Sequence, residues 1–254
     1  MSSEPYSVCD PCLPFIEPAT GIMVRETQAM DLPAIEALSR RVYPQQRPWA
    51  LPDLRRHLEH FPEGQLVAID LQTGALCGMA ASLVLRSDAF PEDASWLEVT
   101  GGGTLSTHDA RHGTLLYGAE VMVDPDSRGR GVGKALYRGR RALAQGRRLD
   151  GIMAGARIPG YRKHASVLSA EAYVERVVRG EICDPTLSFQ LRQGFVALRV
   201  VRNYLHDPDS LHHAVVIYWP SPERAARARS RGRARGGALP RGLALAPALI
   251  DQAS

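Results

Sequence analysis

The segment VDPDSRGRGVGKAL, from Val123 to Leu136, carries glycine at three alternate positions: 129, 131 and 133. Glycine loses more conformational freedom on folding than other residues, so alternating glycines indicate a place where bare backbone is needed. The apolar run before Pro125 predicts a strand, and the apolar spacing after Gly133 predicts a helix. Backbone N–H groups and the helix dipole favour an anion at the start of such a helix. The segment therefore predicts a phosphate-binding turn between a strand and a helix.

Two common phosphate-binding patterns do not fit these glycines. A P-loop needs glycine at position 128 and Ser or Thr at position 135, where this chain has Arg128 and Ala135. The dinucleotide fingerprint needs its third glycine at position 134, which is Lys134. A third pattern follows a strand that ends in Val-x-Pro. It has Arg or Gln at its first position, Gly at its fourth, and Gly or Ala at its sixth. It is matched by Arg128, Gly131 and Gly133.

On these residues the chain resembles the GNAT superfamily of acetyl-CoA-dependent N-acyltransferases. The motif covers residues 120–145, and the order of the expected elements agrees over about residues 22–219, the expected domain. The resemblance implies an α/β fold: a mixed, twisted sheet of about six to seven strands, splayed between the fourth and the fifth and flanked by helices. The stretches at 116–118, 161–185 and 187–195 resemble a GNAT subgroup that is sometimes joined to a carbon–nitrogen hydrolase domain.

The resemblance implies that acetyl-CoA is the co-substrate and that no metal takes part. The pyrophosphate of coenzyme A would lie on the glycine turn and the start of the helix: Arg128, Gly129, Arg130, Gly131, Val132, Gly133 and Lys134. Three of these side chains are cations, which suit phosphate oxygens. The pantetheine arm would pair, as an added strand, with the backbone of Val121, Met122 and Val123.

Acyl transfer to an amine needs a base for the amine proton, a donor for the tetrahedral oxyanion and a proton for the leaving thiolate. The resemblance implies direct transfer in a ternary complex, with Glu120 as the base and a backbone N–H near Met122 for the oxyanion. His108 and His112 are alternative bases, because histidine titrates near neutral pH. A primary amine is the expected acceptor.

The expected acid departs from the family pattern. Many members place a tyrosine in a late helix, and that position is Gln190 in the stretch FQLRQGF. Tyr204, on the strand expected at 196–205, is the predicted substitute, and solvent is the other source of the proton. The missing tyrosine keeps a second hypothesis open: a catalytically silent CoA-binding or partner-binding module of the same fold.

Composition limits the remaining interpretations. Residues 1–21 are expected to be flexible, and residues 220–254, rich in Arg and Ala, are expected to be disordered. The segment 221–254 holds seven arginines and two carboxylates, so the net charge of +4 arises there. Nucleic-acid binding by this segment is the less favoured hypothesis, because no aromatic residues lie between the arginines. Residues 86–114 are expected to form a long loop.

The absence of certain patterns also matters. No apolar run approaches the roughly 20 residues of a membrane span, and no leader pattern opens the chain, so a cytoplasmic protein without membrane contact is predicted. Cys9 and Cys12 form a CxxC without a second pair at zinc-site spacing, so no metal site is predicted. A homodimer is an open alternative.

Overall fold

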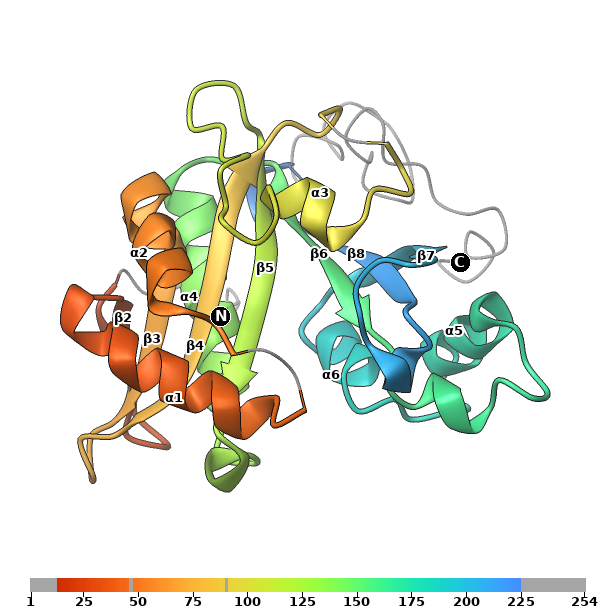
Figure 1. Cartoon of the computed structure of the whole chain (residues 1–254), viewed down its shortest axis with the longest axis horizontal. Coiled ribbons are helices and arrows are strands. Elements are labelled where there is room, and N and C mark those ends of the chain that lie inside the picture. The colour runs from red at the N-terminus through yellow and green to blue at the C-terminus, as the bar shows by residue number, and fades with distance from the viewer. Residues whose placement is uncertain (1–12, 46–47, 90, 225–254) are drawn as a thin grey trace, which may run out of the picture.

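The computed structural model describes residues 13–45, 48–89 and 91–224. Eight strands form one sheet in the order β1-β2-β3-β4-β5-β6-β8-β7 (Figure 1). The strands are β1 (Phe15–Glu17), β2 (Ile22–Glu26), β3 (Gln65–Asp70), β4 (Leu76–Leu85), β5 (Leu115–Val123), β6 (Gly151–Arg157), β7 (Val196–Val201) and β8 (Ala214–Pro220). The α-helices are α1 (Leu32–Val42), α2 (Leu51–His60), α3 (Trp96–Thr100), α4 (Val132–Gly146), α5 (Ala170–Val178) and α6 (Leu187–Arg192).

Helices cover both faces of the sheet. α1 and α2 lie in front of it in Figure 1, and α4 lies behind it. The apolar residues of α1 recur at spacings of three and four, and this stripe, with Ile35 and Leu38, packs on Met79 and Met122 of the sheet. On the other face, Leu136 of α4 packs against Leu66. Buried apolar side chains therefore fix the helices on either side of β4 and β5.

β5 and β6 separate after a short parallel stretch. They pair from Leu115↔Gly151 to Gly118↔Ala154. Beyond Gly118, β5 continues to Val123 with β4 as its neighbour, while β6 keeps β8 as its neighbour. These are the fourth and fifth strands expected from the sequence, so the predicted splay is confirmed.

A β-bulge lies in β5 where the two strands separate. Ala81 of β4 is opposite Glu120, and Ser82 is opposite Gly118, so Ala119 is an extra residue in β5. A bulge of this kind disturbs the ladder and redirects the side chains that follow it.

The fold class is confirmed, but the sheet has more strands than the six to seven predicted. Phe15–Glu17, inside the segment expected to be flexible, pairs with β2 and makes an eighth strand. The ring of Phe15 is buried, and the guanidinium of Arg138 lies 5.3 Å from its centroid. The sequence offers little indication of this strand, because three residues are too few to show the alternating pattern of a strand.

Two local predictions are also wrong. The loop expected at 86–114 contains α3, whose N-terminus has a capping box in which Ser95 and Glu98 each accept the other's backbone N–H. This Ser-x-x-Glu signal was present in the sequence. β7 ends at Val201, so Tyr204 lies in the turn that follows it rather than on the strand.

Some predictions concern residues outside the described ranges. These are the CxxC of Cys9 and Cys12 and the part of the arginine-rich segment from residue 225 onward. Over 13–45, 48–89 and 91–224, no helix has both the length and the apolarity that crossing a membrane requires.

Candidate active site

The glycine turn connects the end of β5 to the start of α4. Gly129 and Gly131 have φ values of +77° and +82°, in the left-handed region that only glycine adopts at little cost. A Cβ on Gly133 would lie 3.2 Å from the ring of Phe189, tighter than ordinary contact. Backbone conformation therefore requires glycine at positions 129 and 131, and packing requires it at position 133.

The turn presents cations and backbone donors. Arg128, Arg130 and Lys134 are exposed. Arg130 forms a 2.8 Å ion pair with the carboxylate of Asp70, the last residue of β3. α4 begins at Val132, and the N–H groups of a first helical turn have no acceptor within the helix. This end of α4 can therefore hold a phosphate group.

The predicted pantetheine strand has one open edge. Val121, Met122 and Val123 pair with β4 on one side, and none of the described strands pairs with them on the other. An open edge of this kind can accept an extended ligand as an added strand. The N–H of Val121 already donates a 2.9 Å hydrogen bond to the carboxylate of Glu120.

Glu120 lies half-buried at the start of this open edge. Tyr43, just after α1, donates a 3.0 Å hydrogen bond from its hydroxyl to Oε1 of Glu120. Burial raises the pKa of Glu120, while the hydrogen bonds from Tyr43 and Val121 and the charge of Arg157 oppose this. A raised pKa brings a carboxylate nearer to the range in which it acts as a general base at neutral pH.

Arg157 and Asp207 support Tyr43. Arg157 ends β6 and lies 5.8 Å from the centroid of the Tyr43 ring. Its guanidinium donates two hydrogen bonds, of 2.7 and 2.6 Å, to the buried carboxylate of Asp207. Tyr43 and Glu120 are 77 positions apart, and no local pattern marks Tyr43, so sequence reasoning missed this group.

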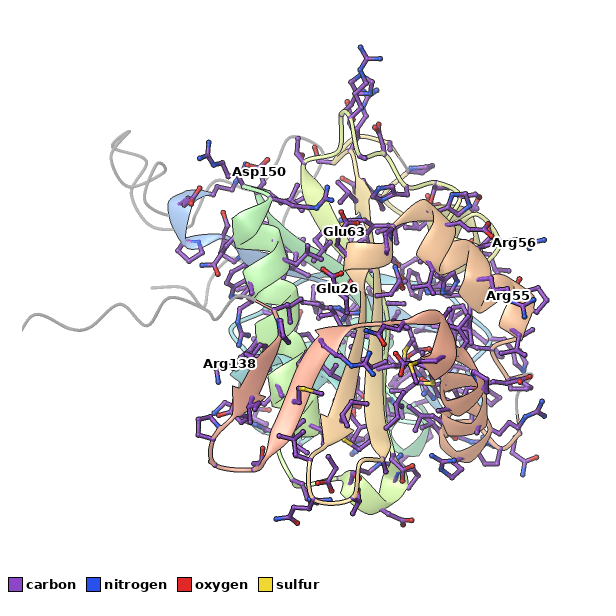
Figure 2. The ribbon with its side chains drawn as sticks, turned by 90° about the vertical axis from the view of Figure 1, so that its left-hand side faces the viewer. Glu26, Arg55, Arg56, Glu63, Arg138 and Asp150 are labelled. Atoms are coloured by element: carbon purple, nitrogen blue, oxygen red, sulfur yellow. The ribbon has the colours of Figure 1, made fainter. Side chains whose placement is uncertain are left out.

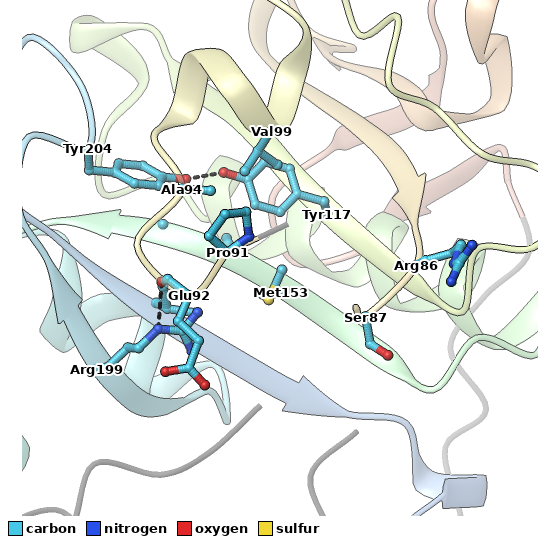
Figure 3. A pocket seen from close by; sticks show the side chains of 13 residues that line it. Arg86, Ser87, Pro91, Glu92, Ala94, Val99, Tyr117, Met153, Arg199 and Tyr204 are labelled. Carbon is cyan, nitrogen blue, oxygen red and sulfur yellow. Dashed lines mark hydrogen bonds between the residues drawn. The ribbon is translucent and has the colours of Figure 1, made fainter. Parts of the chain in front are cut away.

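Tyr204, the predicted acid, lies elsewhere. Its buried hydroxyl shares a hydrogen bond with the hydroxyl of Tyr117 on β5. Both rings line a cavity of about 40 Å³ beneath α3, together with Met153 and Gly155 of β6 (Figure 3). Burial raises the pKa of Tyr204. The structure pairs Glu120 with Tyr43 rather than with Tyr204.

The other candidate groups have contacts of their own. Gln190 donates a 2.9 Å hydrogen bond to the hydroxyl of Tyr137 on α4. His108 accepts the N–H of Val84 and stacks on Phe61. His112 is exposed and lies 3.4 Å from Asp109. Neither histidine is held against Glu120, and within the described ranges no three His, Cys, Asp or Glu side chains gather as a metal site would need.

The sequence is similar to that of a known protein family. The model of the "Acetyltransferase (GNAT) family" matches residues 32–162. The "Uncharacterized N-acetyltransferase YkwB" of Bacillus subtilis (strain 168) is 38% identical over 177 residues, which cover 70% of this chain and 77% of that protein.

A longer relative adds a second comparison. The "Probable hydrolase YhcX" of Bacillus subtilis (strain 168) is 38% identical over 199 residues, 78% of this chain. The chain spans only 38% of that relative's length. A relative of this size and name fits the resemblance to the subgroup that is joined to hydrolase domains.

Among solved structures, the fold is similar to that of the GphF GNAT-like decarboxylase in complex with isobutyryl-CoA. The TM-score is 0.65 at 24% identity, and the match covers 78% of this chain and 98% of that one. At this identity the likeness concerns the fold. With the family model matching half of the chain and a relative of 38% identity matched over most of its length, the chain belongs to the acetyltransferase (GNAT) family.

Proposed function

We propose that the protein is an N-acyltransferase that moves an acetyl group from acetyl-CoA to a primary amine by direct transfer in a ternary complex. The observation that carries this function is the position of Glu120 at the start of an open strand edge that leads, within one strand, to the glycine turn. A cofactor arm, its phosphates and a base would thus share one continuous stretch of chain.

The residues present fit coenzyme A. The left-handed glycines 129 and 131 leave the backbone of the turn bare, and Arg128 and Lys134 extend from it into solvent. Phosphate groups bind well to such helix N-termini. The edge from Val121 to Val123 would hold the pantetheine arm. When bound, acetyl-CoA supplies the thioester that is transferred.

Glu120 takes one proton from the ammonium form of the acceptor in this mechanism, directly or through a water. The neutral nitrogen then attacks the thioester carbon, the C–N bond forms, the C–S bond breaks, and the nitrogen gives its second proton to solvent as the amide forms. Backbone N–H of β5 near Met122 would stabilise the negative oxygen. The thiolate takes its proton from solvent, because the hydroxyl of Tyr204 is buried and engaged by Tyr117.

Calorimetric titration with acetyl-CoA tests the binding half of this function. Gly131→Val should abolish binding, because its side chain enters the bare turn. Gly74→Val is the matched control: Gly74 is also left-handed, at φ +71°, but lies in the β3–β4 turn. Normal binding by Gly131→Val would mean that the cofactor does not bind at the turn. No binding by the unaltered protein would overturn the proposed function.

Thiol release in the presence of acetyl-CoA and a panel of amines tests the chemical half. The panel holds a polyamine, free amino acids, an aminoglycoside and a lysine peptide. The buried contact between Gln190 and Tyr137 favours a second candidate, a silent CoA-binding module, because Gln190 stands where many members have tyrosine. Tight binding without thiol release across the panel would support that second candidate.

A further inference from the structure

α4 carries a buried arginine that forms no ion pair with a carboxylate of the described residues. The side chain of Arg140 is 1% exposed, and none of the ion pairs among the described residues includes it. Removing a charge from water is costly unless other groups compensate for it. Burial accordingly lowers the pKa of Arg140. A well-packed apolar residue would avoid this cost, so the contacts of Arg140 need an explanation.

The guanidinium of Arg140 makes its hydrogen bonds at the bulge of β5. Nε donates to the hydroxyl of Ser82 at 3.0 Å, and Nη2 donates to the carbonyl of Ala81 at 2.6 Å. Nη2 also donates to the carbonyl of Glu120. Ala81 and Ser82 belong to β4, so one guanidinium joins the two strands across the point where Ala119 interrupts their pairing.

The chain is shaped to admit this guanidinium. A Cβ on Gly118 would lie 2.8 Å from Nη1 of Arg140. On the opposite face, the indole N–H of Trp96 donates a 2.9 Å hydrogen bond to the carbonyl of Ala119. The bulge is therefore held from α4 at Glu120 and from α3 at Ala119.

The bulge decides which way Glu120 faces. Leu116 packs in the cluster that contains Tyr137 of α4, and Gly118 faces Arg140 of the same helix. Met122 packs instead on α1 and α2, and Glu120 reaches Tyr43. Residues at even positions thus change faces between 118 and 120. Without the bulge, regular alternation would direct Glu120 toward α4.

We propose that Arg140 is a positioning residue for acyl transfer: by joining β4 to the bulge of β5 it fixes the direction of the Glu120 carboxylate and the line of the open edge from Val121 to Val123. This role rests on the proposed function, in which Glu120 is the base.

Arg140 also affects Glu120 by its charge. The titratable and charged groups around Glu120 are Tyr43, just after α1, Arg157 of β6 and, from α4 on the other face of the sheet, Arg140 and Tyr137. The positive charges of Arg157 and Arg140 lower the pKa of Glu120, against the effect of burial. Removing the charge of Arg140 should therefore raise that pKa, and the carboxylate form that accepts a proton would be lost at a higher pH.

Three variants separate charge from geometry. Arg140→Met removes both, and Arg140→Lys keeps a cation. Gly118→Ala keeps Arg140 but places a methyl group against its guanidinium. Arg138→Met is the matched control, because Arg138 lies on the outer side of the same helix near β1 (Figure 2) and pairs with Glu17. Each variant is made in the full chain, and its folding is checked by circular dichroism and thermal unfolding.

Two measurements need no known acceptor: the ¹³C NMR titration of the Glu120 carboxyl, assigned with Glu120→Gln, and the calorimetric affinity for acetyl-CoA. Arg140→Met should move the Glu120 titration to higher pH, and Arg140→Lys should restore it. Gly118→Ala should leave the titration near that of the unaltered protein. Both Arg140→Met and Gly118→Ala should weaken acetyl-CoA binding by roughly tenfold, the effect of about one lost hydrogen bond to a charged group. With an acceptor in hand, kcat should fall by roughly a hundredfold, as for a displacement of about 1 Å.

A folded Arg140→Met whose Glu120 titration and acetyl-CoA affinity equal those of Arg138→Met would overturn the role of Arg140. If Arg140→Met does not fold, Gly118→Ala decides: an acetyl-CoA affinity equal to that of the unaltered protein overturns the role of Arg140. Failure of the proposed function is distinct, because the unaltered protein would then either not bind acetyl-CoA or bind it without thiol release, while the NMR titration would still show whether Arg140 controls Glu120.

Discussion

The hydroxyl of Tyr43 donates a 3.0 Å hydrogen bond to the carboxylate of Glu120, and so joins the end of α1 to the middle of β5. The contact stabilises the charged form of Glu120 and orients it. Because Tyr43 is itself half-buried between Glu120 and Arg157, burial and the nearby carboxylate raise its own pKa. Tyr43 therefore stays protonated and continues to donate throughout the neutral range.

Tyr43→Phe should lower kcat by about tenfold and move the acid limb of the pH–rate profile to higher pH. The hydrogen bond lowers the pKa of Glu120, and a net loss of about 1.5 kcal/mol is typical for a bond to a charged group. The measurement is the rate of thiol release between pH 5 and 9. Tyr161→Phe is the control, since the Tyr161 hydroxyl donates to the carbonyl of Leu168. An unshifted profile would assign Tyr43 to packing alone.

Glu120→Gln should lower turnover by roughly a hundredfold or more, the usual range for a lost general base, and leave acetyl-CoA affinity nearly unchanged. Its rate should also lose the decline at acid pH, because the titrating group is gone. Glu26→Gln offers a comparison on β2, where the glutamate is exposed (Figure 2). Equal rates and equal profiles in the two variants would return Glu120 to a structural role.

Asp207→Asn should destabilise the fold by roughly 2 kcal/mol, less than a fully buried pair would give, because Arg157 is partly exposed. Although burial opposes it, the hydrogen bonds from Arg157 and Ser210 hold the pKa of Asp207 below its ordinary value. A carboxyl whose pKa is lowered by folding stabilises the fold at pH values above its unfolded-state pKa, which is near 4. This stabilisation is lost as the pH falls through the folded-state pKa. Thermal unfolding should therefore show the two proteins converging in acid, and a constant difference would contradict the ion pair.

Tyr204→Phe should change kcat little and reduce stability by about 1 kcal/mol, since it leaves the buried hydroxyl of Tyr117 without its partner. Rates and urea unfolding curves of the variant measure the two effects. A large loss of kcat at unchanged stability would restore Tyr204 as the acid that protonates the thiolate.

Much of the fold could be predicted from the sequence because its signals are local. The glycines at 129 and 131 indicate left-handed backbone within a few residues of the helix that follows them. The Ser95 and Glu98 capping box was equally local and was available to sequence reasoning. β1 is different: Phe15 is stabilised by pairing with β2 and by Arg138, contacts that its own neighbours in the chain do not reveal.

The candidate site could be predicted only in part. The turn and the strand before it are one continuous segment, and the motif marks both. Tyr43, just after α1, and Arg140, on α4, meet Glu120 from separate parts of the chain, and periodicity cannot show which polar residue of a helix faces a bulge. The bulge itself is equally hidden, since Ala119 differs from its neighbours in register rather than in chemistry.

The ion pair between Arg130 and Asp70 has a consequence for selectivity. The turn has three cations in its sequence, but in the free protein the nearly buried carboxylate of Asp70 already neutralises one of them. A phosphate that binds there must compete with Asp70 for the guanidinium, so affinity for any simple polyanion is lower than the count of cations suggests. A ligand that also pairs with the open strand edge gains backbone hydrogen bonds that a bare polyanion cannot make. The site therefore favours a ligand with both a phosphate group and an extended arm over nucleic acid or free phosphate.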